Sequence, residues 1–451
     1  MSLSDHPKAY GTAALVAAFA AGILVTLGFK DAYPELESRF QEKRRRPGGP
    51  RGKGPSGQRR RSSIFWGTPV TLEDHELDSP PRPCDGIVED GIAGCIGHTP
   101  LLKIRSLSEA TGRTILAKAE FLNGAGNSPK DRVALGILRD AEKRGLLTPH
   151  RGDTIYEGTV GSTGISLATL ARAMGYRAHI CMPDDQSHEK SDLLLHLGAA
   201  VERVPVAPIT SPGHFVNLAR RRAAEHAAAH DDGSRGFFAD QFESAANWQA
   251  HAATTGPEIW QQTGGRVDAF VAGAGTGGTI AGVARYLKQQ AAAAAAEESV
   301  RVVLADPQGS GLYNKVKHGV MYAPTEREGT RRRQQVDSMV EGVGVNRVTA
   351  NFEAGRELVD DAVKVTDEQA CRMARWLVER DGLFLGSSSA VNCVAAVAAA
   401  TALPPGSVVV TVLCDAGTRH LSKFWKHVKE LGLEEHEATD LFAELGLERQ
   451  P

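Results

Sequence analysis

The sequence lacks several features that would assign it quickly to a functional class. Its six cysteines include no C-x-x-C pair, and no cluster of histidine and cysteine has the spacing of a zinc site, so we expect no metal. The formal net charge is only −2, which gives no indication of nucleic-acid binding. Several cysteines lie in apolar runs, which indicates reduced, buried thiols.

The length and composition are those of a sizeable globular protein. The chain has 451 residues, enough for two or three domains or for one two-lobed enzyme. Hydrophobic residues make up 41% and charged residues 24%, which is ordinary for a protein with a large core.

The N-terminal region has an uncharged, apolar run. No charged residue lies between Lys8 and Lys30, and about 20 residues at ~1.5 Å each cross a bilayer core of ~30 Å. Basic residues follow at 43–61, and the positive-inside rule places that side in the cytosol. The pattern predicts a short tail at 1–10 and a single-pass anchor at 11–29. The cleaved signal peptide is the alternative, although the run is long for one. The basic flank favours the mitochondrial outer membrane.

The remainder of the chain alternates apolar strands with helical segments. Residues 30–91 read as a basic, Gly/Pro-rich linker, 92–430 as the main folded region and 431–451 as a C-terminal tail. We predict strands at 114–119, 154–156, 178–182, 201–206, 267–272, 300–305 and 408–413. We predict helices at 130–145, 165–174, 189–197, 220–230, 248–262 and 280–288. This alternation predicts an α/β fold with parallel sheets covered by helices, in which ligands bind at the carboxyl ends of strands.

Two loops rich in Gly, Ser and Thr, at 158–164 and 273–279, each follow a predicted strand and open a helix. Backbone N–H groups and the helix dipole favour anions at such places, so the loops predict two anion cradles. The second loosely fits G-x-G-x-x-G, but it lacks the later acidic residue of a dinucleotide site and the Gly-Lys-Ser/Thr of a P-loop. A single phosphate monoester fits it better, and a tight turn without ligand is the alternative.

Lys130 stands at a predicted helix start, with Ser128 as N-cap and Pro129 at the first helical position. A cation in the first turn is disfavoured by the helix dipole, and a surface lysine paired with Asp131 is the ordinary interpretation. Together with two anion cradles, however, a lysine suggests a Schiff base with an aldehyde cofactor. Pyridoxal 5′-phosphate supplies an aldehyde, a monophosphate and an electron-accepting ring, and the other cradle would hold the carboxylate of an amino-acid substrate.

Ordered motifs carry a family resemblance over 92–425. The matches are 96–101 to I-G-N-T-P-L, 127–132 to P-x-x-S-x-K-D-R, 158–164 to T-S-G-N-T-G, 241–260 to Q-F-x-N-x-x-N…H-x-x-T-T-G-P-E-I-W, 275–279 to G-T-G-G-T, 386–389 to G-I-S-S-G and 415–422 to P-D-x-x-x-R-Y-L-S. The chain resembles the cysteine synthase and cystathionine β-synthase family of pyridoxal-phosphate enzymes (fold type II, tryptophan-synthase-β-like), and in particular a membrane-anchored branch of it.

The resemblance implies a two-lobed fold, with a smaller lobe at about 130–240 and a larger lobe at 92–129 plus 241–430. It implies that Lys130 holds the cofactor and is the catalytic base. The implied cofactor-binding residues are Lys130, Ser162, Gly275, Thr276, Gly277, Gly278, Thr279 and Ser388, with Ser388 at the pyridine nitrogen. The implied substrate-binding residues are Thr159, Gly161, Thr163 and Gln241.

The implied activity is β-replacement, which forms cysteine from O-acetylserine and sulfide through an aminoacrylate intermediate, in a homodimer. A serine or cysteine dehydratase or desulfhydrase, and a membrane-tethered cofactor-binding protein with weak catalysis, are the alternatives. The alternatives arise because Val160 and Ser162 replace the family's serine and asparagine in the substrate loop. Cys414 and His420 likewise replace a proline and a tyrosine.

Overall fold

The computed structural model describes residues 87–229, 231–294, 299–321, 338–435 and 438–449. The chain divides into two units, Met1–Asp74 and His75–Pro451, and all of the described residues belong to the second.

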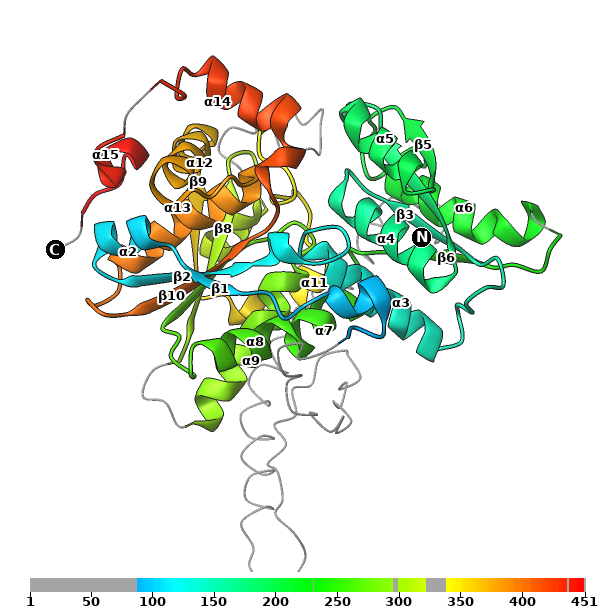
Figure 1. The fold of residues 1–451 in the computed structure, drawn as a ribbon, viewed down its shortest axis with the longest axis horizontal. Helices are drawn as coiled ribbons and strands as arrows, with labels where there is room; N and C mark the ends of the chain where they lie inside the picture. Colours follow the sequence, from blue (N-terminus) through cyan, green and yellow to red (C-terminus); the bar gives the residue numbers. More distant parts are fainter. Residues whose placement is uncertain (1–86, 230, 295–298, 322–337, 436–437, 450–451) are drawn as a thin grey trace, which may run out of the picture. The chain divides into compact units, whose positions relative to one another are not determined.

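These residues form two sheets (Figure 1). One has the strand order β1-β2-β10-β7-β8-β9 and the other the order β5-β4-β3-β6. The strands are β1 Leu101–Lys103, β2 Thr114–Ala119, β3 Thr154–Gly158, β4 Arg177–Pro183, β5 Ala200–Val204, β6 Gly236–Phe238, β7 Ala269–Gly273, β8 Arg301–Pro307, β9 Asp361–Val365 and β10 Val408–Leu413. Strand β1 pairs antiparallel with β2, and the other pairs are parallel.

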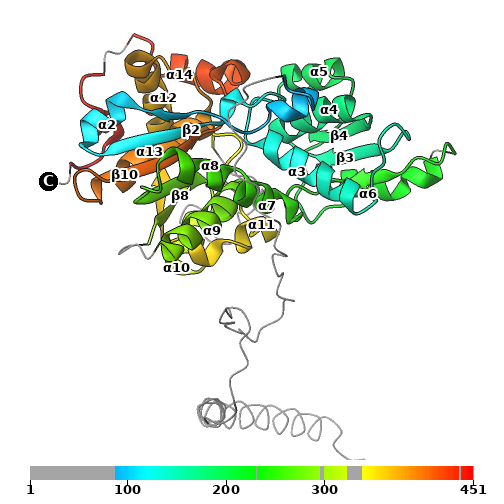
Figure 2. The same ribbon diagram turned by 60° about the horizontal axis from the view of Figure 1, so that its bottom comes forward.

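Helices cover both faces of each sheet, as Figure 2 shows for α12, α13, α8 and α9. The helices are α2 Arg105–Thr111, α3 Lys130–Lys143, α4 Ser162–Met174, α5 His188–His196, α6 Phe215–Ala229, α7 Ala246–Ala253, α8 Thr255–Gln262, α9 Gly278–Ala293, α10 Leu312–His318, α11 Ala350–Glu353, α12 Asp367–Asp381, α13 Ser387–Thr401, α14 Lys426–Glu430 and α15 Leu441–Leu445.

Both faces of these strands are buried, which explains why their apolar runs are continuous. In β7, Val271 packs into the core with α12 and α13, whereas its neighbours Phe270 and Ala272 pack into the core with α9. In β4, Ile180 packs against α3 and α4, and Cys181 packs against α6. Because successive side chains point to opposite faces, strands covered on both sides are apolar at every position. The prediction of parallel sheets covered by helices is confirmed.

One predicted helix is two helices in the structure. The segment 248–262 is divided between α7 and α8 at Thr254, whose φ and ψ are −126° and −67°. Pro257 lies in the first turn of α8, and it has no N–H to continue the hydrogen-bond ladder from α7. The helix therefore stops and begins again.

The predicted single-pass membrane anchor is wrong. No helix among the described residues is long and apolar enough to cross a membrane. The longest of them, α9, has 16 residues, whereas a span needs about 20. The segment predicted to cross, 11–29, lies outside the described residues, and so do the predicted tail at 1–10 and nearly all of the linker at 30–91.

The last described residues pack against the larger sheet's helices. Leu441, Phe442 and Leu445 of α15 are buried in the core that contains α12. Residues 438–449, part of the segment assigned to a C-terminal tail, therefore contribute to the folded body.

Candidate active site

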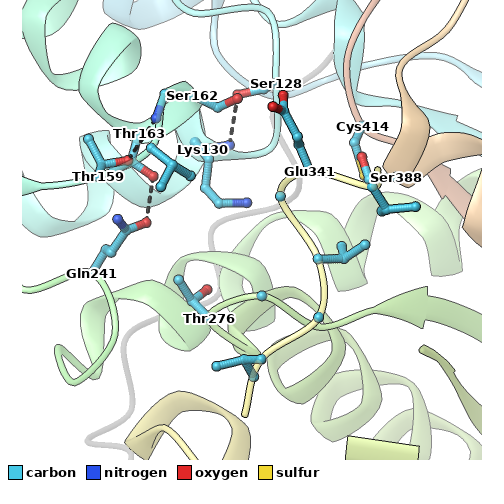
Figure 3. A pocket seen from close by; sticks show the side chains of 18 of the residues that line it. Ser128, Lys130, Thr159, Ser162, Thr163, Gln241, Thr276, Glu341, Ser388 and Cys414 are labelled. Atoms are coloured by element: carbon cyan, nitrogen blue, oxygen red, sulfur yellow. Dashed lines mark hydrogen bonds between the residues drawn. The ribbon is translucent and has the colours of Figure 1, made fainter. Parts of the chain in front are cut away.

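A cavity of about 840 Å³ lies where β3, β7 and β10 end at their carboxyl termini, the usual place for ligands in parallel α/β sheets. The structure brings almost every predicted site residue to this cavity. Those that line it are Lys130, Thr159, Gly161, Ser162, Thr163, Gln241, Gly275, Thr276, Gly277, Thr279 and Ser388. In the view of Figure 3, Lys130 extends between the Thr159–Thr163 loop and Gln241 on one side and Ser388 and Cys414 on the other.

Lys130 begins α3, and Ser128 caps this end. The Ser128 Oγ accepts a hydrogen bond from the Lys130 backbone N–H at 3.2 Å, although the helix starts one residue later than predicted. Asp131 is not a surface partner for the lysine, because it is fully buried. Its carboxylate instead accepts hydrogen bonds from the Gly126 N–H at 2.7 Å and the Ser166 hydroxyl at 2.6 Å. The ordinary interpretation of Lys130 as half of a surface ion pair is therefore wrong.

The second glycine-rich loop, at 273–279, runs from the end of β7 to the start of α9. Its glycines allow other parts of the backbone to approach it closely. Gly277 has a positive φ of 85°, and a Cβ on Gly275 would lie 2.3 Å from the Gly342 carbonyl oxygen. Gly278 is the one predicted site residue that does not line the cavity, because it packs against the Asn247 side chain. Backbone N–H groups at this helix start make a cradle that suits a phosphate monoester.

The side chains of this cradle are held by buried neutral partners. Asn247 Nδ2 donates to Thr276 Oγ1 at 2.9 Å, and His251 Nε2 lies 3.1 Å from Thr279 Oγ1. Burial lowers the pKa of His251 to about 3, so the imidazole is neutral at physiological pH. The cradle therefore owes its affinity for an anion to N–H groups and the dipole of α9.

The first loop, at 158–164, leads from β3 into α4 and is anchored by a series of hydrogen bonds. The Thr163 hydroxyl donates to Gln241 Oε1 at 2.5 Å, and Gln241 Nε2 donates to Glu157 Oε1 at 3.1 Å. Glu157 is fully buried, and burial raises its pKa to about 8. Sequence reasoning did not single out Glu157. Its only signal was a carboxylate inside an apolar strand directly before the loop.

Glu157→Gln is expected to remove a pH dependence of stability. Below pH ~8 the folded protein keeps Glu157 protonated, whereas the unfolded chain ionises it above its ordinary pKa of 4.5. The folded state therefore binds more protons, and the free energy of unfolding of the wild type falls as pH rises through this window. The test is chemical denaturation at pH 5.5, 7 and 8.5. The free energy of unfolding of Glu157→Gln, relative to that of the wild type, should increase with pH by a few kcal/mol at most. The exposed control Glu353→Gln should show no such gain, and equal profiles for both variants would contradict the expectation.

Ser388 lies in the first turn of α13 and is buried beside Cys414, which follows β10. Asn392 Nδ2 donates to the Val412 carbonyl at 2.8 Å and lies 3.6 Å from the Cys414 sulfur. Burial raises the pKa of the Cys414 thiol to about 11, so the group remains a neutral thiol. This end of the cavity therefore presents two uncharged groups, a hydroxyl and a thiol.

A buried network of charges lies behind Lys130. Arg132 donates from Nε to Glu120 at 2.8 Å and from Nη1 to Glu258 at 2.6 Å, and Lys118 Nζ lies 2.5 Å from Glu258. Burial opposes ionisation of Glu120, but Arg132 outweighs it and holds the pKa of that carboxyl at about 2. The network joins β2, α3 and α8, and thereby fixes the start of the helix that carries Lys130.

Outside the cavity, His179, Cys181 and Glu202 lie together on β4 and β5, with ligand atoms within 4.8 Å of one another. Arg222 donates to both Glu202 oxygens, at 3.1 and 2.8 Å. Burial raises the pKa of the Cys181 thiol to about 12. We interpret this cluster as a hydrogen-bonded ion pair.

A lysine, a phosphate cradle and a carboxylate cradle in one cavity of a two-sheet α/β fold define the class of a pyridoxal-phosphate enzyme of fold type II. The family model described as "Pyridoxal-phosphate dependent enzyme" matches residues 92–415. The chain belongs to this family, and the resemblance inferred from the motifs is confirmed at this level.

Named relatives align with most or nearly all of this chain. "Cysteine synthase 2" of Neurospora crassa is 69% identical over 99% of this chain and 99% of its own length. "Cysteine synthase 2" of Emericella nidulans is 57% identical over 95% of this chain and 96% of its own. A Saccharomyces cerevisiae relative, 54% identical over 78% of this chain and 86% of its own, is described as mitochondrial. The predicted membrane-anchored branch finds no support among them.

Solved structures share the fold. The chain superposes on "O-ureido-L-serine synthase" with a TM-score of 0.62 at 31% identity, covering 77% of this chain and 96% of that one. It superposes on "O-acetylserine dependent cystathionine beta-synthase" from Helicobacter pylori with a TM-score of 0.60 at 33% identity, covering 74% and 97%.

Proposed function

We propose that the protein is a cysteine synthase, which forms cysteine from O-acetylserine and sulfide with pyridoxal phosphate as cofactor. The observation that carries this proposal is the placement of Lys130 in one cavity with both anion cradles and Ser388. Two relatives at 69% and 57% identity are named cysteine synthases over nearly their full lengths, which supports the same activity.

The residues around the cavity fit the cofactor. The N–H groups of Gly275, Thr276, Gly277 and Thr279 would form the phosphate site, and the close contact of Gly275 with Gly342 excludes a side chain that would fill it. Lys130, Ser162 and Ser388 line the same cavity. By the family resemblance, Lys130 Nζ would provide the amine for the aldehyde, Ser162 would bond the ring hydroxyl and Ser388 would bond the ring nitrogen. Bound pyridoxal phosphate supplies an electrophilic carbon and a ring that withdraws electrons from the substrate Cα.

The substrate loop positions the amino acid. Thr159, Gly161 and Thr163 line the cavity where the α-carboxylate would bind. The Thr159 hydroxyl accepts from the Gly161 N–H at 3.3 Å and the Thr163 hydroxyl donates to Gln241 at 2.5 Å, so these bonds fix the shape of the loop. Lys130 Nζ is then the base that takes the Cα proton. Ser388 would offer the ring nitrogen an uncharged hydroxyl in place of a carboxylate, an arrangement that would favour loss of the acetate.

Val160 and Ser162 are compatible with this role. Val160 removes a hydroxyl donor from the loop, but the backbone N–H groups that bind a carboxylate do not depend on that side chain. No observation favours a dehydratase, a desulfhydrase or a non-catalytic protein over a cysteine synthase. We also propose that the protein assembles as a homodimer, as the family resemblance implies, and light scattering of the purified protein would measure this.

Product analysis tests the activity. Purified, cofactor-loaded protein given O-acetylserine should release acetate and form cysteine in proportion to added sulfide, measured by mass spectrometry. Pyruvate and ammonia formed at the same rate with and without sulfide would instead identify a lyase.

A further inference from the structure

Lys190 joins the substrate side of the cavity to the opposite side. It lies in α5, beside the smaller sheet, and its Nζ is 2.7 Å from Glu341 Oε2. Glu341 belongs to a segment that packs with the larger sheet, because its neighbours Val340 and Val343 are in that sheet's core. Both charged side chains are 17% exposed and both line the cavity. The ion pair therefore connects two sides of the cavity that contains the proposed substrate site.

The Lys190 side chain also lies directly against the substrate loop. A Cβ added at Gly161 would lie 3.5 Å from the Lys190 Cδ and 4.0 Å from its Nζ. The Lys190 side chain thus borders the space left by the missing side chain of Gly161. Val160, the preceding residue, offers no polar side chain there. An anion bound at Gly161 would therefore meet the Lys190 ammonium.

Glu341 has other polar and charged neighbours besides Lys190. Its backbone N–H donates to the Ser387 hydroxyl at 3.0 Å, which fixes the segment. Its carboxylate also lies 3.6 Å from His420 Nδ1 and 3.6 Å from Lys423 Nζ. Loss of Lys190 would therefore leave Glu341 with the Lys423 ammonium and the His420 imidazole as neighbours, which avoids the cost of an uncompensated, partly buried charge. Lys190 in turn keeps a hydrogen bond to Gln186 at 3.1 Å.

We propose that Lys190 is a substrate-binding residue, which exchanges Glu341 for the α-carboxylate of the amino-acid substrate. The exchange gives the loop the donor that Val160 lacks, and it makes a free carboxylate a condition of tight binding. This inference rests on the proposed function, because it takes the ligand of the loop to be an amino acid.

The test compares the binding of L-serine and L-serinamide to cofactor-loaded, full-length protein by calorimetry. L-Serine carries the carboxylate, and the amide differs only in lacking that charge. Because hydrogen bonds to charged groups contribute ~1.5–3 kcal/mol, Lys190→Met should weaken L-serine binding about 10- to 100-fold. Its affinity for L-serinamide should stay within about twofold of the wild type, and cofactor content, measured by absorbance, should not change.

Two further variants separate substrate binding from a purely structural ion pair. Glu341→Gln frees Lys190 from its competitor, so it should bind L-serine as tightly as the wild type or more tightly. Lys288→Met breaks a comparable ion pair, with Asp360 at 2.6 Å, far from the cavity lining and should leave both affinities unchanged. Equal weakening by Lys190→Met and Glu341→Gln, or equal effects on acid and amide, would overturn the proposal. If the wild type bound neither ligand and made no cysteine, the proposed function would fail instead.

Discussion

Replacing Lys130 with alanine is expected to lower kcat/KM for cysteine formation by ~10²- to 10⁴-fold, the range for loss of a general base. The effect should be large because one amine serves both proposed tasks, attachment of the cofactor aldehyde and removal of the Cα proton. The cofactor would still reach the cradle at Gly275–Thr279, so the variant should bind it with an altered visible absorbance. Steady-state kinetics and absorbance spectra of the purified variant measure the two effects.

Two controls make this result specific. Lys130→Arg keeps the positive charge but provides no comparable nucleophilic amine, so it should be nearly as inactive as the alanine variant. Lys143→Ala changes an exposed lysine in the last turn of the same helix and should retain wild-type kinetics. Activity above one tenth of wild type in Lys130→Ala would show that the reaction does not depend on this residue.

Replacing Arg132 with methionine is expected to destabilise the protein by ~3–5 kcal/mol, the range for breaking a buried ion pair by removing one partner. Arg132 is almost fully buried and is shared by Glu120 and Glu258. Methionine would leave two carboxylates in a low-dielectric interior with Lys118 as their remaining cation. Urea denaturation followed by circular dichroism measures the change in unfolding free energy.

The comparison for Arg132 is an exposed arginine at the C-cap of the same helix. Arg144 pairs with Asp140 at 3.1 Å with both side chains largely in solvent, and such pairs contribute at most ~0.5 kcal/mol. Arg144→Met should therefore be nearly neutral. If both variants lowered stability equally, or if Arg132→Met were neutral, the buried network would not stabilise the start of α3.

Some elements could be predicted residue for residue, and others could not. The strands at 114–119 and 408–413 agree with β2 and β10, because each is a buried strand with an apolar run bounded by polar residues. Strand β9, Asp361–Val365, escaped prediction since charged residues alternate with its apolar ones and it lies at the edge of the sheet. The break at Thr254 was missed because the apolar pattern runs on through Pro257.

Some residues of the site could likewise be predicted from the sequence, and others could not. Residues in short local motifs, such as Gly275, Thr276 and Lys130, were predictable because the loop and helix start that position them are encoded nearby in the sequence. The Lys190–Glu341 pair was not, because its members are 151 positions apart and meet only through the tertiary fold. Glu157 was also missed, since nothing in a strand's sequence says that its carboxyl will be buried beneath a loop.

The most direct test of cysteine synthesis at this cavity is a visible-absorbance titration of the cofactor-loaded wild-type protein. O-Acetylserine is added first and sulfide second, with the products quantified at the end. We expect the spectrum to shift on the first addition and to return to its starting form on the second, with one cysteine formed per acetate released. A spectrum that does not respond to O-acetylserine, or a shift that sulfide does not reverse, would contradict the proposed function.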